Sequence, residues 1–269
     1  MSQEAQDMIK KTVIYEMPGT EDVTVRRDVE YAQSEAGALT FDLYAPPGSP
    51  PEARLPAVVI VAGYPDAGFV QRLGCDFKEM GSSVSWARLI AASGMAAIAY
   101  TNREPEADLQ ALLRHVRDNA AALAIDPARI GVWASSGNVP LALSLLLRDA
   151  AVPLRCALLA YGYLLDLEGT TRVADAAGMF GFVHPCDGKS VADLSPEIPL
   201  LLVRAGQDQI PHLNETIERF VAQALPANLP LTLVNHPTGP HAFDLFEDSA
   251  AARGVIRQML AFLRAHLLS

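Results

Sequence analysis

The residues Arg129-Ile130-Gly131-Val132-Trp133-Ala134-Ser135-Ser136-Gly137-Asn138 are the most informative part of this chain, since they predict a short buried strand that runs directly into a turn with two serines. Residues 139–147 follow at once as an apolar segment and predict a helix. A strand, a turn and a helix in this order form a nucleophile elbow, where a strained turn pushes one hydroxyl within reach of a base. The helix behind the turn aims its N–H groups at any oxyanion that forms.

Ser135 and Ser136 compete for the place of the nucleophile. In such a tight turn, the residues two before and two after the nucleophile must be small. For Ser136 these flanking residues are Ala134 and Asn138, whereas Ser135 would place the bulky Trp133 at the first position. We therefore favour Ser136, with asparagine in place of the usual glycine, because asparagine tolerates unusual backbone angles better than most residues. The competing interpretation is that a serine here only caps the helix.

Composition and charge limit the possible functions. The chain has 269 residues, half of them hydrophobic, which is enough for one large domain with a sizeable core. A net charge of −10 without a Lys/Arg cluster argues against a nucleic-acid partner. No apolar stretch is long enough to span a bilayer, and residues 1–11 contain no signal-peptide core. With three widely spaced cysteines that lack a metal-binding pattern, we expect a cytoplasmic, reduced protein without a membrane partner.

The order of the expected elements predicts a mostly parallel sheet. Residues 1–22 have the character of a loosely tied N-terminal arm, and 23–269 of a single domain. Strands at 23–31 and 39–44 alternate apolar and polar residues and predict an antiparallel hairpin. Beyond the hairpin, buried strands alternate with helices, which predicts a parallel sheet covered on both faces. The long irregular connection 162–198 is typical of a lid or a binding loop.

The other elements follow from the spacing of apolar residues. Asp126-Pro127 fits the N-cap and first-turn proline of a helix. An exposed edge strand at 229–235 would offer a surface for a homodimer. Helices are predicted at 84–92, 107–124, 214–224 and 249–268, and strands at 57–62, 95–100, 130–133, 155–161, 199–205 and 229–235.

A serine hydroxyl needs an adjacent base and a third group that orients the base. In a parallel sheet such partners lie at the C-terminal ends of later strands. The strand at 199–205 ends in Gly206-Gln207-Asp208, so the Asp208 carboxylate follows the strand closely and fits the chain order Ser, Asp, His. The alternatives are that Asp208 is only a turn residue, or that Asp166 is the acid.

The expected base is His241, one of six histidines. It lies in the loop Pro237-Thr238-Gly239-Pro240-His241-Ala242-Phe243, between the last strand and the last helix, and a loop can swing a base over the sheet edge. His236 is the alternative, but it directly abuts its strand. The order Ser136, Asp208, His241 supports this assignment more than any single residue does.

Two N–H donors are needed to hold an oxyanion. One is expected from Gly137, the residue after the nucleophile, and the other from the loop Gly63-Tyr64-Pro65-Asp66. Gly63 allows a close approach of the backbone. Because Pro65 has no N–H, Tyr64 is the expected donor. The competing interpretation of this loop is a Gly-Pro turn without a functional role.

Together these segments resemble the α/β-hydrolase superfamily, close to its dienelactone-hydrolase-like and serine carboxylesterase branches, from about residue 23 to the C-terminus. The resemblance implies an eight-stranded, mostly parallel sheet with helices on both faces, a Ser–Asp–His triad, and no metal or organic cofactor. Glycine is common at the positions of Ala134 and Asn138, and the oxyanion loop lacks a His-Gly-Gly-Gly run. Dienelactone hydrolases have a cysteine nucleophile where this chain has Ser136, which favours ester over lactone cleavage. The resemblance is carried by residues 63–66, 126–138, 205–208 and 239–243.

The combined prediction is a carboxylesterase-type serine hydrolase. The triad would be Ser136, Asp208 and His241, the oxyanion donors Tyr64 and Gly137, and the partner a small-molecule ester with a short acyl group. Met179, Phe180, Phe182 and Val183 either line an acyl pocket or attach their segment to the core. A lactonase, peptidase or acyltransferase with the same triad is the alternative, followed by a catalytically silent binding protein.

Overall fold

A hairpin of β1 (Thr24–Ser34) and β2 (Gly37–Ala45) forms one edge of the sheet. The computed structural model describes residues 7, 9–34, 37–50, 52–148, 150 and 152–269. Within them, eight strands lie in the order β1-β2-β4-β3-β5-β6-β7-β8. The predicted eight-stranded, mostly parallel sheet is confirmed. Its further strands are β3 (Leu55–Ile60), β4 (Ala96–Tyr100), β5 (Ile125–Ser135), β6 (Cys156–Ala160), β7 (Leu200–Ala205) and β8 (Leu231–His236).

The sheet is antiparallel only at its first edge, where β1 pairs with β2 and β2 with β4. Every later neighbouring pair is parallel, from β4 with β3 to β7 with β8. All residues of β4 and β6 are buried, as expected for strands covered on both faces. β8 lies at the other edge, and its outward residues are exposed.

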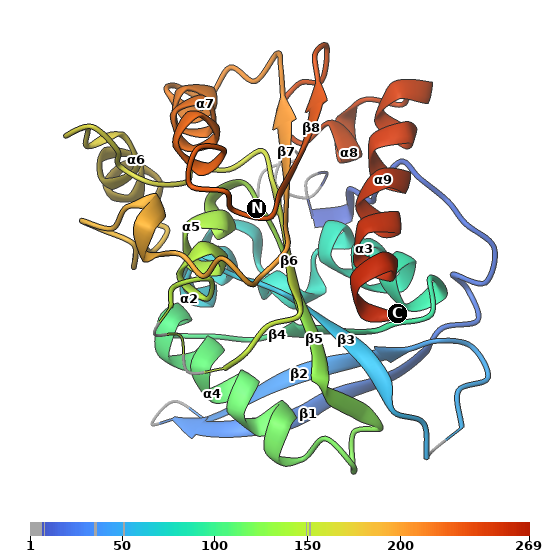
Figure 1. The fold of residues 1–269 in the computed structure, drawn as a ribbon. Coiled ribbons are helices and arrows are strands. Elements are labelled where there is room, and N and C mark those ends of the chain that lie inside the picture. The colour runs from blue at the N-terminus through green and yellow to red at the C-terminus, as the bar shows by residue number, and fades with distance from the viewer. Residues whose placement is uncertain (1–6, 8, 35–36, 51, 149, 151) are drawn as a thin grey trace.

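Helices cover both faces of the strongly twisted sheet (Figure 1). α3 (Gly81–Ala92) and α9 (Ala250–Leu267) lie on one face, and α4 (Pro105–Asp118), α5 (Val139–Ser144) and α7 (Leu213–Ala224) on the other. Between one parallel strand and the next, the chain crosses a face of the sheet, as in other parallel α/β folds. The described part also contains α2 (Asp66–Leu73), α6 (Arg172–Phe180) and α8 (Phe243–Phe246).

The first arm of the chain packs on α3. Val13 is buried, and its N–H donates to Ser85 Oγ at 3.0 Å. The N–H of Ile14 donates to the carbonyl of Asp244 in α8 at 2.9 Å. The arm therefore reaches the elements that border the candidate site.

Two predicted helix features are wrong. Asp126-Pro127 does not start a helix but belongs to β5, where Ile125 pairs with Leu55. Asp126 does accept a capping-type hydrogen bond, from the N–H of Ala128 at 3.1 Å, but it closes a local turn instead of a helix. The helix predicted at 107–124 spans Pro105–Asp118 and is followed by turns, with Ala124 at a φ of 57°.

No helix in the described ranges has both the length and the apolar character that a membrane crossing requires. The long connection at 162–198 contains α6, which the sequence did not predict. Its function as a lid stays a prediction, as does the homodimer at the β8 edge.

Candidate active site

Ser136 occupies the apex of the turn between β5 and α5. Its φ is 56°, in the left-handed region that costs a residue with a side chain about 1–2 kcal/mol. Ser135, in contrast, has ordinary extended angles, with a φ of −135° and a ψ of 155°. A serine with a strained backbone, half-buried at the wall of a pocket, is the expected geometry of a nucleophile elbow. The geometry therefore favours Ser136 over Ser135.

Glycines on neighbouring loops make room for this turn. A Cβ on Gly162 would collide with the carbonyl oxygen of Ser136 and with Val139. A Cβ on Gly63 would lie 2.9 Å from both the Cα of Asn138 and the carbonyl oxygen of Gly137. A tight elbow usually needs glycine within the turn itself. Here the room for the turn comes from glycines on the loops that face it.

The structure brings Ser136, His241 and Asp208 into one hydrogen-bonded chain. Ser136 Oγ lies 2.9 Å from His241 Nε2, and His241 Nδ1 lies 2.6 Å from Asp208 Oδ2. The Asp208 side chain has no exposed surface, whereas the His241 side chain is 24% exposed. A buried carboxylate that binds one ring nitrogen leaves the other nitrogen free to accept the serine proton.

The loops that carry Asp208 and His241 are joined to each other. The N–H of Gly206 donates to the carbonyl of His236 at 2.8 Å, and the N–H of Gln207 donates to that of Gly239, also at 2.8 Å. A Cβ on Gly206 would collide with the backbone of Pro237. Asp208 and His241 are therefore held as one unit beyond the ends of β7 and β8.

The alternative base and acid have structural partners. His236 is 2% exposed, its ring packs edge-on against Phe243, and its Nε2 lies 3.0 Å from Glu247 Oε2. Asp166 accepts hydrogen bonds from the N–H groups of Val173 and Ala174 at 2.9 and 3.0 Å, at the start of α6. Neither reaches Ser136.

The predicted oxyanion loop lies directly against the elbow through Asn138. The Asn138 carboxamide is 5% exposed, accepts from the N–H of Gly63 at 2.8 Å, and donates to the carbonyl of Ser135 at 3.1 Å. Among the described residues, the N–H groups of Tyr64 and Gly137 have no protein acceptor. The sequence did not indicate this function for Asn138, because its partner Gly63 is 75 positions away in the chain.

Asp66 fixes the far end of the oxyanion loop. It is 5% exposed and accepts hydrogen bonds from the N–H groups of Phe77 at 2.9 Å and Asn102 at 2.7 Å. Burial raises the pKa of its carboxyl to about 6, although both hydrogen bonds act in the opposite direction. The loop is thus tied to the segment after β4 and to the turn before α3.

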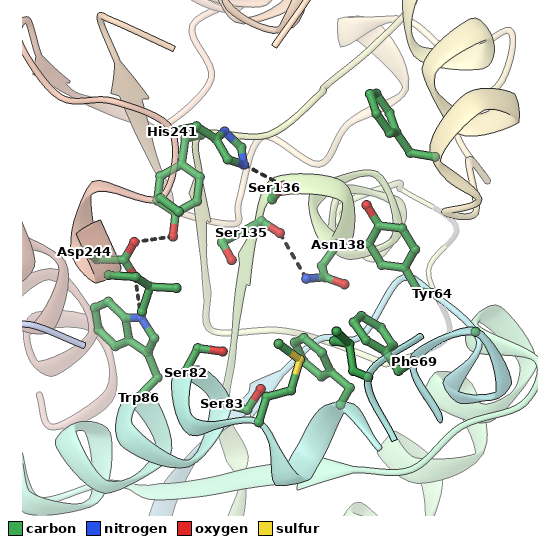
Figure 2. Close-up of a pocket in the computed structure, with 18 of the residues that line it drawn as sticks. Tyr64, Phe69, Ser82, Ser83, Trp86, Ser135, Ser136, Asn138, His241 and Asp244 are labelled. Atoms are coloured by element: carbon green, nitrogen blue, oxygen red, sulfur yellow. Dashed lines mark hydrogen bonds between the residues drawn. The ribbon is translucent and has the colours of Figure 1, made fainter. Parts of the chain in front are cut away.

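A pocket of about 620 Å³ opens beside Ser136 and His241 (Figure 2). Tyr161 packs edge-on against the His241 ring, with centroids 5.2 Å apart, and its hydroxyl donates to Asp244 Oδ1 at 2.6 Å. Trp86 Nε1 donates to Asp244 Oδ2 at 2.7 Å. Burial raises the pKa of Asp244, a polar residue in an otherwise apolar helix that the sequence did not single out. Other walls come from Phe69, Phe77, Met80, Ser82, Ser83, Trp133, Leu245 and Phe246.

The segment expected to form the acyl pocket contributes only in part. Phe180 lines the pocket, whereas Met179 is 74% exposed and does not. Phe182 is buried between Tyr64 and Tyr163, with ring centroids 5.9 and 5.8 Å away. Val183 donates its N–H to the carbonyl of Gly63 at 2.9 Å. One residue thus lines the cavity and two attach the segment to the core and to the oxyanion loop.

Among the residues with described positions, no three His, Cys, Asp or Glu side chains gather as a metal site would require. The described side chains at the site supply a serine hydroxyl, an imidazole and a carboxylate beside an apolar cavity.

No protein-family model and no curated protein sequence matches this chain. Solved structures match over nearly its whole length. An esterase from the Planctomycetes species Thermogutta terrifontis, Est2, has a TM-score of 0.67 at 20% identity and covers 92% of this chain and 94% of its own. Est2 with bound butyrate has a TM-score of 0.64 at 19% identity over 93% and 95% of the two chains. A bacterial heroin esterase has a TM-score of 0.68 at 18% identity over 95% and 88%. The chain has the α/β-hydrolase fold of these esterases, and its branch stays a prediction.

Proposed function

We propose that this protein is a serine hydrolase that cleaves carboxylic esters through an acyl-enzyme on Ser136. The observation that supports this best is the continuous chain of contacts from Ser136 Oγ to His241 Nε2 at 2.9 Å and from His241 Nδ1 to Asp208 Oδ2 at 2.6 Å. The positive φ of Ser136 supports it independently, since a strained serine beside a histidine has no evident structural purpose.

In the proposed mechanism, His241 Nε2 takes the proton of Ser136 as the hydroxyl attacks the ester carbonyl. Asp208 keeps the proton of Nδ1 in place and stabilises the positive charge that forms on the ring. The N–H groups of Tyr64 and Gly137 hold the oxyanion of the tetrahedral intermediate. The imidazolium then gives its proton to the leaving alcohol, and water hydrolyses the acyl-enzyme by the same steps.

The substrate is proposed to be a small ester with a short acyl group. The pocket beside Ser136 is walled mostly by aromatic and aliphatic side chains, which favour an uncharged substrate. Est2, which shares the fold, has been seen with propionate and with butyrate bound. We therefore expect acetyl to butyryl esters to be cleaved faster than long-chain lipid esters.

A panel of p-nitrophenyl esters of two to sixteen carbons, beside lactones and aminoacyl amides, tests this proposal on the wild type and on Ser136→Ala. We expect fast cleavage of the short esters, slow cleavage of the other classes, and loss of activity in Ser136→Ala. Ser135→Ala is the matched control, since it removes the neighbouring hydroxyl and should keep activity. If lactones or amides are cleaved faster than esters, the protein is a lactonase or a peptidase and not an esterase.

Labelling by a fluorophosphonate probe separates an enzyme from a silent binding protein. A covalent adduct on Ser136 of the wild type, located by peptide mass spectrometry, is the expected result. An adduct on Ser135 instead would place the nucleophile one residue earlier. No adduct on either serine would favour a protein that kept the fold without the reaction.

A further inference from the structure

The side chain of Tyr64 lies against the elbow, in addition to its main chain. The space where a Cβ of Gly137 would stand is taken up by the Tyr64 hydroxyl, so the phenol touches the residue that follows Ser136. Figure 2 shows Tyr64 on one side of Ser136 and His241 on the other, both facing the pocket. This is the side of the serine on which an oxyanion must lie, since the histidine occupies the opposite side.

The Tyr64 hydroxyl has no hydrogen-bond partner among the described residues, and some of its surface remains open. Three other buried tyrosines do donate: Tyr31 to the carbonyl of Thr101 at 2.6 Å, Tyr161 to Asp244 at 2.6 Å, and Tyr163 to the carbonyl of Pro211 at 2.7 Å. A hydroxyl that is partly removed from water usually finds an acceptor. The hydroxyl of Tyr44 is also buried without a partner, but Tyr44 is not among the residues that line the pocket. Tyr64 does line it, so a substrate in the pocket can bring the missing acceptor.

The ring of Tyr64 is held in place by its neighbours. Phe69 and Phe182 pack edge-on against it, with ring centroids 5.6 and 5.9 Å away. These contacts come from α2 and from the segment after α6, two parts of the chain that are far apart in the sequence. The phenol is therefore fixed before any substrate arrives, and a donor fixed in advance costs no reorganisation during the reaction.

We propose that the hydroxyl of Tyr64 donates a hydrogen bond to the oxyanion of the tetrahedral intermediate, beside the main-chain N–H of Gly137. This inference rests on the proposed ester hydrolysis and adds a catalytic side chain to it. The acceptor is the former carbonyl oxygen of the ester, which gains negative charge when Ser136 attacks and loses it when the alcohol leaves.

The electrostatics of the site suit this function. Burial raises the pKa of Tyr64 to about 12, so the phenol keeps its proton at neutral pH. A phenol also donates more strongly to an anion than to a neutral carbonyl, because charge shortens and strengthens the bond. The hydroxyl should therefore stabilise the transition state more than the bound ester.

Tyr64→Phe tests the proposal because it removes only the hydroxyl. With p-nitrophenyl butyrate we expect kcat to fall about 10- to 100-fold and KM to change by less than about threefold. A butyryl trifluoromethyl ketone, which forms an oxyanion-bearing adduct with the serine, should bind weaker by the same factor as the loss in kcat. The melting temperature should stay at the wild-type value, since the hydroxyl bonds to no protein group.

Tyr31→Phe is the matched control, because its hydroxyl is also buried but donates within the fold, on an outer strand. It should lower the melting temperature and leave kcat unchanged. An unchanged kcat in Tyr64→Phe, or a loss confined to KM, would overturn the proposal while the esterase stands. A wild type that cleaves no ester would overturn the proposed function, and this inference with it.

Discussion

The carboxamide oxygen of Asn138 accepts a hydrogen bond from the N–H of Gly63 at 2.8 Å, and so joins the serine turn to the loop that faces it. The amide group of Asn138 donates to the carbonyl of Ser135 at 3.1 Å. The φ of Asn138 is −84°, which any residue adopts, so the backbone does not require glycine here. The side chain of Asn138 therefore holds the loop at Gly63 against the serine turn, and with it the expected oxyanion donors.

Asn138→Ala should leave the N–H of Gly63 buried without an acceptor. We expect the free energy of unfolding to fall by about 1–3 kcal/mol, the usual cost of such a group. We also expect kcat to fall at least tenfold, because the oxyanion loop is released from the elbow. Urea unfolding and ester kinetics measure both effects. Asn119→Ala, which removes an exposed carboxamide at the end of α4, is the control and should change neither.

Asp208→Asn should abolish most of the activity with little effect on stability. An amide in place of the carboxylate favours the wrong tautomer of His241, and in a serine protease this change lowers kcat about 10⁴-fold. Asp166→Asn is the matched variant, since Asp166 holds the start of α6 through two N–H groups. It should lower the melting temperature and keep kcat within about twofold. A greater loss of kcat in Asp166→Asn than in Asp208→Asn would make Asp166 the acid of the triad and Asp208 the structural residue.

Phe180→Ala should widen the range of acyl chains. Phe180 is half-buried and lines the pocket, so its truncation opens space beside Ser136. We expect the ratio of kcat/KM for octanoyl to butyryl esters to rise about 3- to 10-fold, since burial of one methylene group contributes about 0.8 kcal/mol, roughly a factor of four. Met179→Ala changes a neighbour that is 74% exposed and lies outside the pocket lining. If both variants shift the ratio equally, Phe180 does not bound the acyl site.

Asp66 should make stability fall as pH rises between about 4 and 6. Burial raises its pKa to about 6 in the folded protein, from the ordinary 3.8. Between these values the unfolded chain releases a proton that the folded protein keeps, so the unfolded state gains stability. Relative to Asp66→Asn, the wild type should lose up to about 3 kcal/mol of unfolding free energy over this window. Urea unfolding of both proteins from pH 3.5 to 7 measures the difference, and a constant or rising difference would contradict the prediction.

The sequence was enough to predict the sheet, the elbow and the partners that the structure brings to Ser136. Each of these depends on a local pattern: a short apolar run, a glycine or proline after it, and a polar residue next in line. His241 was preferred over His236 because only a loop can carry a base across the sheet edge, and the geometry agrees. Asp126-Pro127 was misleading because a capping-type turn occurs equally well within a strand.

The rest depends on contacts between distant residues, which leave no local pattern. Asn138 meets Gly63, Trp86 and Tyr161 meet Asp244, and the turn at Ser136 meets Gly162. The helices α2, α6 and α8 have eight, nine and four residues, so each repeats the apolar spacing of a helix too few times to be recognised in the sequence. Sequence patterns thus indicated the candidate catalytic residues, and the fold was needed to find what surrounds them.

The hydrogen bonds between the loops after β7 and β8 have a practical consequence. Asp208 and His241 both belong to the last third of the chain, while Tyr64 and Ser136 precede α5. A cut between α5 and β6 would give two fragments. The first would contain Tyr64 and Ser136, and the second Asp208 and His241. The proposed ester cleavage would return only when the fragments reunite along β5 and β6, which makes this fold a candidate two-piece reporter for proteins fused to its halves.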